Sequence, residues 1–185
     1  IGGDFSMNIY PPDDYNVYYR DIKAIAEALV DEFGIDEVRS WRFGCMTEYE
    51  NGGWFQAKSG KPKDSMIAYC KLYDYTVQAL IDVLGEDITV GAHSMTVTEG
   101  LWDEADFIKH VAKGTNYANG GKGTKISFLS ASFYDSKPGK YTGGKTLPQT
   151  IKYLMGLKIC FTALMRAGFS MATARARMMI SLICV

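Results

Sequence analysis

The sequence FGIDEVRSWRFGCMTE, at residues 33–48, passes from the end of one secondary-structure pattern into another. Before it, apolar residues recur at helical spacing from residue 18 onward, and Gly34 follows the last of them, where helices often stop. Within it, residues 38–46 have the composition of a strand and precede a loop rich in Gly, Asn and Lys. The stretch therefore predicts a helix over residues 18–33 and a strand over residues 38–46.

The same alternation continues along the rest of the chain. We expect further helices at residues 64–84, at 102–111 and from about 147–148, with strands at 88–92 and 126–134 and a loop at 114–123. Regular alternation favours parallel strands joined by crossover helices, so the predicted fold class is α/β. A barrel segment and an open sheet both fit this order. The nucleotide-binding open sheets lack their usual evidence, because no GxGxxG or P-loop motif lies at a strand-to-helix turn, and this favours the barrel.

The composition indicates a globular domain. A formal net charge of −1 and a hydrophobic fraction of 47% argue against a nucleic-acid binder, a polybasic membrane-surface protein or a disordered tail. Four cysteines without a CxxC pair and only two histidines predict no metal, no cofactor and no dense disulfide frame. No apolar run reaches about 18 residues, so no membrane span is expected, while oligomeric state and compartment stay open.

Chemically versatile side chains follow the predicted strands. Thr47, Glu48 and Trp54 come after the first strand, His93 comes after the second, and Tyr134 ends the third. In parallel α/β folds, the carboxyl ends of the strands and the loops that follow them build the active site. Carboxylates, aromatic rings and small polar groups together suit a sugar, because aromatic rings stack on its faces and polar groups bind its hydroxyls. The sequence thus points to a carbohydrate ligand.

Two segments carry a family resemblance. PPDDYN at residues 11–16 and FGIDEVRSWRF at residues 33–43 resemble the third-helix and fourth-strand region of glycoside hydrolase family 39, the β-xylosidases and α-L-iduronidases. In that family the strand ends in an FEVWNEP pattern whose Glu is the catalytic acid/base, and FGCMTEY at residues 43–49 is similar to it, with Glu48 on the acid. The family's order and approximate spacing continue over residues 8–137.

The resemblance implies a (β/α)8 TIM barrel, of which this chain supplies about the middle strands and helices. A complete barrel usually needs roughly 250 residues, so we interpret residues 1–185 as a single incomplete glycosidase-like barrel domain. The implied function is a retaining glycoside hydrolase that acts on O-glycosidic bonds, with a carbohydrate substrate and neither a nucleic-acid partner nor a membrane partner. Glu48 would protonate the departing oxygen and then deprotonate water, while a second carboxylate about 5 Å away forms the glycosyl-enzyme intermediate. That role needs a raised pKa, from partial burial and a nearby negative charge.

Three departures from the family pattern favour a different interpretation. The family's Asn before the acid is Thr47 here, its Pro after the acid is Tyr49, and its His-x-Tyr on the sixth strand is Ser132-Phe133-Tyr134. Tyr134 is therefore carried over and the histidine is not. The alternative is a non-catalytic carbohydrate-binding pseudoenzyme of the same fold. A third possibility is an α/β domain of other function that shares only the barrel architecture.

The other candidate residues have binding or packing roles. Thr47 takes the place of an Asn that binds a sugar hydroxyl, and Trp54 is interpreted as a sugar platform rather than a loop anchor. His93 either donates a hydrogen bond to substrate or packs at the strand end, and Tyr134 can both stack and hydrogen-bond. We expect Glu50 to be a solvated loop residue and both Trp41 and Trp102 to be packing residues.

The tail at residues 154–185 is atypical for the family. No Asp or Glu occurs after Asp135, although the family's nucleophilic Glu lies on the seventh strand, which should fall near residues 158–168. With permitted codons, a shifted reading frame across residues 161–168 can encode Tyr-Gly-Val-Asp-Glu-Gly-Arg, similar to an iduronidase-like nucleophile strand. The alternative is a genuine hydrophobic helix that closes a shortened domain, and the nucleotide sequence distinguishes the two. On either interpretation we expect residues 1–185 alone to lack the nucleophile and to be inactive.

Overall fold

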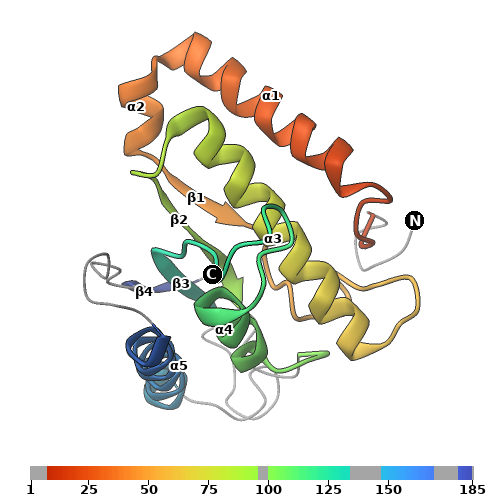
Figure 1. The fold of residues 1–185 in the computed structure, drawn as a ribbon. Helices are drawn as coiled ribbons and strands as arrows, with labels where there is room; N and C mark the ends of the chain where they lie inside the picture. Colours follow the sequence, from red (N-terminus) through yellow and green to blue (C-terminus); the bar gives the residue numbers. More distant parts are fainter. Residues whose placement is uncertain (1–7, 96–99, 134–146, 169–178, 185) are drawn as a thin grey trace.

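The computed structural model describes residues 8–95, 100–133, 147–168 and 179–184. Its helices are α1 (Tyr15–Phe33), α2 (Ile35–Ser40), α3 (Pro62–Leu84), α4 (Glu104–Lys113) and α5 (Leu147–Gly168), and its strands are β1 (Arg42–Cys45), β2 (Thr89–Met95), β3 (Phe128–Phe133) and β4 (Met179–Cys184). The four strands form one sheet in the order β1-β2-β3-β4, and every neighbouring pair is parallel (Figure 1). The predicted α/β class is confirmed.

The helices follow the order of the strands. A helix connects each strand to the next, α3 between β1 and β2, α4 between β2 and β3, and α5 between β3 and β4. Along the layer, α1 packs against α3, α3 against α4, and α4 against α5 (Figure 1). Side chains of the central strands, such as Val90, Ala92, Leu129 and Ala131, are fully buried, as expected for a covered parallel sheet. The carboxyl ends of the strands therefore lie at one edge of this sheet.

Local sequence signals set most helix ends. The Asp14 side chain accepts a hydrogen bond from the Asn16 amide at 2.7 Å and begins α1, and Asp103 caps α4 in the same way. Gly34 and Gly85, with φ of 83° and 84°, end α1 and α3 in the left-handed region that favours glycine. The helices predicted at residues 18–33, 64–84 and 102–111 are confirmed, with no end shifted by more than three residues.

The predicted strand at residues 38–46 is wrong in its first part. Residues 38–40 end the short helix α2, and β1 begins only at Arg42. Asp36 and Glu37 lie in the first turn of α2, where negative charge stabilises a helix. The Arg39 guanidinium then donates a hydrogen bond from Nε to the Leu84 carbonyl oxygen at 2.6 Å, which ties α2 to the end of α3. That contact joins residues distant in sequence, so the local pattern does not reveal it.

The C-terminal region continues the α/β order. Residues 158–168, where the resemblance placed the seventh strand, are helical and belong to α5, so that expectation is wrong. This helix agrees with the alternative interpretation of the tail, although β4 follows it and pairs with β3 from Phe128↔Met179 to Phe133↔Cys184. The shifted reading frame stays a prediction for the nucleotide sequence. In the described part of the chain, no helix is long and apolar enough to span a membrane.

Candidate active site

Glu48 lies in a tight turn just beyond the last residue of β1, Cys45. Two residues of this turn, Met46 and Glu48, have left-handed φ values of 57° and 44°. Residues with a Cβ rarely adopt this conformation, and it persists where the surrounding structure imposes it, commonly at functional sites. The Asn51 amide donates to the Glu48 carbonyl oxygen at 2.9 Å and closes the turn. Glu48 is thus at the carboxyl end of its strand, the position the sequence predicts for a catalytic residue.

Both glutamates of the turn are removed from solvent. Glu48 is 6% exposed and Glu50 is 0% exposed, so the expectation of a solvated Glu50 is wrong. The physical reason is a contact with a distant segment, because the Glu50 carbonyl oxygen accepts a hydrogen bond from the Leu101 amide at 2.5 Å. A Cβ added to Gly100 would lie 2.7 Å from Glu50 Cγ, so glycine leaves room for this side chain. The turn is therefore covered by residues 100–102.

Tyr49, between the two glutamates, is fully buried among aromatic rings. Its ring stacks on Tyr69 of α3 with centroids 4.0 Å apart and planes 4° apart, and it also contacts Trp102 and Phe107. Burial, with smaller contributions from Glu50 and Glu104, raises the pKa of Tyr49 well above its usual value. Buried carboxyl groups and aromatic rings thus surround the turn.

Trp102 and Trp41, which the sequence predicts to be packing residues, have that role. Trp102 is buried, with its ring 5.8 Å from that of Tyr49. Trp41 contacts the Phe33 ring at 5.4 Å and donates from Nε1 to the Glu37 carboxylate at 2.9 Å. Both predictions are confirmed.

The structure brings together only part of the predicted site. Thr47 and Trp54 are half-buried and lie in the same loop as Glu48, with the Trp54 amide donating to the Asn51 carbonyl oxygen at 3.0 Å. His93 was expected after its strand, but β2 extends to Met95 and includes it, because its parallel pairing with β3 continues to Ala131. The His93 side chain and the whole of Tyr134 lie outside what the structure describes. Their convergence on Glu48 stays a prediction.

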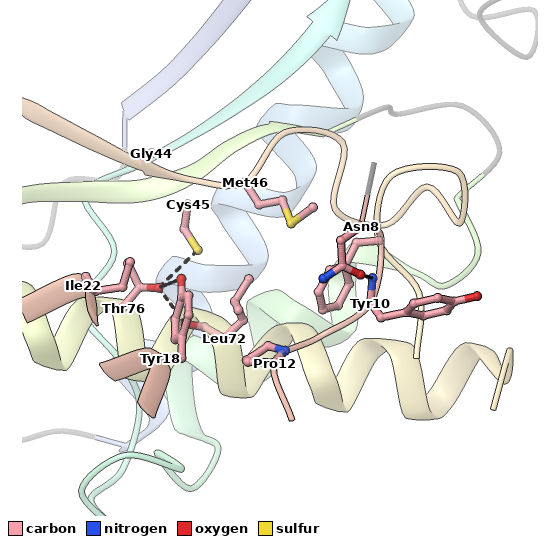
Figure 2. Close-up of a pocket in the computed structure, with 11 residues that line it drawn as sticks. Asn8, Tyr10, Pro12, Tyr18, Ile22, Gly44, Cys45, Met46, Leu72 and Thr76 are labelled. Carbon is pink, nitrogen blue, oxygen red and sulfur yellow. Dashed lines mark hydrogen bonds between the residues drawn. The ribbon is translucent and has the colours of Figure 1, made fainter. Parts of the chain in front are cut away.

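A pocket of about 470 Å³ lies beside the end of β1, between this strand, α1 and α3 (Figure 2). Figure 2 shows the Cys45 side chain pointing toward Thr76 and Tyr18, and the Tyr18 and Thr76 hydroxyls are 2.8 Å apart. Residues of α1 and α3 line this pocket together with the end of β1, so it lies on the helix side of the strand, and Glu48 does not line it. The sequence does not reveal this pocket, because its walls combine residues of α1 and α3 with residues of β1 and of segments far apart in the chain.

The pocket offers little catalytic chemistry. Burial raises the pKa of the Cys45 thiol to about 12, which keeps it protonated at neutral pH and therefore a poor nucleophile. Among the residues that the structure describes, no group of three or more His, Cys, Asp or Glu side chains could hold a metal ion.

Comparisons with known proteins agree with one another. The model of the family described as "Glycosyl hydrolases family 39" matches residues 3–158. A β-xylosidase of Geobacillus stearothermophilus is 29% identical over 130 residues, which cover 70% of this chain and 23% of that protein. A family 39 β-xylosidase from Caulobacter crescentus has a similar structure, with a TM-score of 0.64 and 18% identity over 98% of this chain and 32% of that one.

A bacterial orthologue of human α-L-iduronidase is also similar in structure, with a TM-score of 0.51 and 18% identity over 83% of this chain and 23% of that one. At these identities the structural likeness shows the fold. The chain spans between 23% and 32% of the lengths of these three relatives.

Proposed function

Because the chain belongs to glycosyl hydrolases family 39, we propose that the protein containing it is a retaining glycoside hydrolase acting on O-glycosidic bonds. The substrate class is that of the relatives, a β-xyloside or an α-L-iduronide. The observation that carries the proposal is Glu48, a buried carboxyl group in a left-handed turn at the carboxyl end of β1. The family match covers this turn.

The proposed architecture of the whole protein is a (β/α)8 barrel. Four parallel strands in sequential order, with their helices in the same order, are what an arc of a barrel wall requires. Further strands of the barrel would pair with the outer edges of β1 and β4.

In the proposed reaction, Glu48 donates its proton to the glycosidic oxygen as the bond from that oxygen to the anomeric carbon breaks. A second carboxylate about 5 Å away attacks that carbon and forms the glycosyl-enzyme intermediate. Glu48 then removes a proton from water, which displaces the nucleophile. In the family this nucleophile is a Glu of the seventh strand, and no Asp or Glu occurs after Asp135 in this chain. We therefore expect residues 1–185 alone to be inactive.

Four residues are proposed to bind the sugar. Thr47 would contact a hydroxyl next to the scissile bond, and Trp54, in the same loop, would stack on the ring. His93, near the carboxyl end of β2, and Tyr134, which directly follows β3, would complete the cleft from the neighbouring strands.

Replacement of Glu48 by glutamine tests the proposal in the protein that contains this chain. Glu48→Gln keeps the shape of the side chain and removes the proton, so kcat/KM for aryl glycosides with poor leaving groups should fall about 10²- to 10⁴-fold. Activated leaving groups need less proton donation, so their cleavage should be less affected in the step that forms the intermediate. The exposed Glu86 gives the matched control, because Glu86→Gln makes the same chemical change at the end of α3. Equal turnover of Glu48→Gln and Glu86→Gln on poor leaving groups would remove Glu48 from the mechanism.

The second candidate is a carbohydrate-binding pseudoenzyme. Thr47 and Tyr49 replace the family residues on either side of the acid, and Ser132 replaces a histidine of the sixth strand, which favours loss of the reaction with retention of the cleft. Calorimetric binding of xylo-oligosaccharides or iduronides by a protein that hydrolyses none of the aryl glycosides would support it.

A further inference from the structure

Tyr69 of α3 contacts both ends of the segment that carries Glu48. Its hydroxyl donates a hydrogen bond to the Cys45 carbonyl oxygen at 3.0 Å, at the last residue of β1. Its ring is also the surface on which Tyr49 stacks, with centroids 4.0 Å apart. One fully buried side chain therefore restrains the residue before the turn and the residue after Glu48.

This double restraint acts on strained backbone. Met46 and Glu48 both have left-handed φ values and lie between the two contacts. A turn of this kind relaxes toward extended or right-handed conformations unless its ends are fixed, and relaxation would redirect the Glu48 side chain. Burial raises the pKa of Tyr69 well above its usual value, so its hydroxyl stays a donor at any pH at which the protein would work.

We propose that Tyr69 is the positioning residue of Glu48: its hydroxyl fixes the end of β1 and its ring fixes Tyr49, so that the carboxyl group is held in one orientation. This inference rests on the proposed function, in which Glu48 is the acid/base. Among the described residues, the Tyr69 hydroxyl bonds to Cys45 and its ring stacks on Tyr49, so Tyr69 acts on Glu48 through the turn.

Tyr73 provides a matched control one helical turn further along α3. It is also fully buried, and its hydroxyl donates to the Lys125 carbonyl oxygen at 2.9 Å. Tyr69→Phe and Tyr73→Phe thus delete the same kind of hydrogen bond from the same helix. Only the first deletion frees the end of β1, so a general loss of stability appears in both variants and a loss of positioning appears in one.

The first test is the dependence of turnover on leaving group, measured in the protein that contains this chain with a graded series of aryl β-xylosides or α-L-iduronides. Misplacement of a catalytic group by a fraction of an ångström slows proton transfer, so Tyr69→Phe should lower kcat for the poorest leaving group about tenfold more than for the best. Tyr73→Phe should lower both equally. A Tyr69→Phe series parallel to that of Tyr73→Phe would overturn the inference.

Glu48→Gln distinguishes a failure of this inference from a failure of the proposed function. If Glu48→Gln shows the steep leaving-group dependence while Tyr69→Phe does not, the inference fails and the proposed function stands. If Glu48→Gln changes nothing across the series, the proposed function fails and the inference fails with it.

Hydrogen exchange gives a readout that does not need catalysis. The Asn51 amide donates to the Glu48 carbonyl oxygen, so its exchange rate reports on the turn itself. After correction for global stability, Tyr69→Phe should speed exchange at Asn51 several-fold relative to Tyr73→Phe. Equal exchange in the two variants would show that Tyr69 does not hold the turn.

Discussion

Asp74 is a fully buried residue in the middle of α3, and three polar groups lie within hydrogen-bond distance of its carboxyl oxygens. It accepts hydrogen bonds from the Tyr117 amide at 2.8 Å and from the Thr124 hydroxyl, and it lies 2.9 Å from His110 Nε2. His110 lies in the last turn of α4, and Tyr117 and Thr124 belong to the loop that leads toward β3. A single side chain thus fixes a helix and a loop to α3.

We expect Asp74→Ala to lower the free energy of unfolding by about 3 to 5 kcal/mol, because the buried donors lose their acceptor together. Asp82→Ala is the matched control on the same helix, since Asp82 is exposed, and it should change stability by less than about 1 kcal/mol. Urea unfolding measures both values. Similar losses in the two variants would mean that the buried network contributes nothing beyond an ordinary surface contact.

The pairing of β2 with β3 depends on a glycine. Gly91 pairs with Phe128, and a Cβ added to Gly91 would lie 2.2 Å from the Phe128 carbonyl oxygen. The strands cannot keep their spacing with a side chain at this position, because the obstacle is backbone rather than the flexible end of a side chain.

Alanine at Gly91 and alanine at Gly156 should change the stability of the protein in opposite directions. Gly91→Ala should destabilise the protein by about 3 kcal/mol, since the strands must separate to admit the methyl group. Gly156→Ala, in α5, meets nothing within 4 Å and should stabilise it by about 0.5 to 1 kcal/mol, because alanine favours the helix. Thermal unfolding of both variants measures the difference. Destabilisation by Gly156→Ala would show that α5 does not have the packing described above.

At the scale of elements, helix bounds that depend on neighbouring residues could be predicted from the sequence. Helices α1, α3 and α4 have apolar periodicity and local end signals such as Asp14 and Gly34, so their bounds could be predicted closely. Helix α2 could not, because six residues carry too little periodicity and Arg39 reaches Leu84 across 45 positions. The same limit applies at the candidate site. Glu48 could be placed from its strand, whereas the burial of Glu50 depends on Leu101, far along the chain.

At the scale of the whole molecule, buried thiols and phenols make stability depend on alkaline pH. Burial raises the pKa of Cys45 to about 12 and raises the pKa values of Tyr49, Tyr69 and Tyr73 well above the usual value of 10. In the unfolded chain such groups lose their protons at about pH 8.5 for cysteine and about pH 10 for tyrosine. Above these values the unfolded state binds fewer protons than the folded state, so the free energy of unfolding falls as pH rises.

We therefore predict that these groups leave stability unchanged between pH 7 and 8, and that the midpoint of urea unfolding falls progressively from about pH 9 upward. Each buried group steepens the fall by roughly 1 kcal/mol per pH unit between its unfolded and folded pKa values. Because a thiol in the unfolded chain titrates before most tyrosines do, Cys45→Ala should reduce the slope from about pH 9 upward, throughout the interval between the unfolded and folded pKa values of the thiol. Tyr73→Phe should instead reduce it only above about pH 10, because a phenol in the unfolded chain titrates later than a thiol. A midpoint that stays constant to pH 10.5, or identical slopes in the two variants and the parent protein, would show that these hydroxyls and thiols are not buried as described.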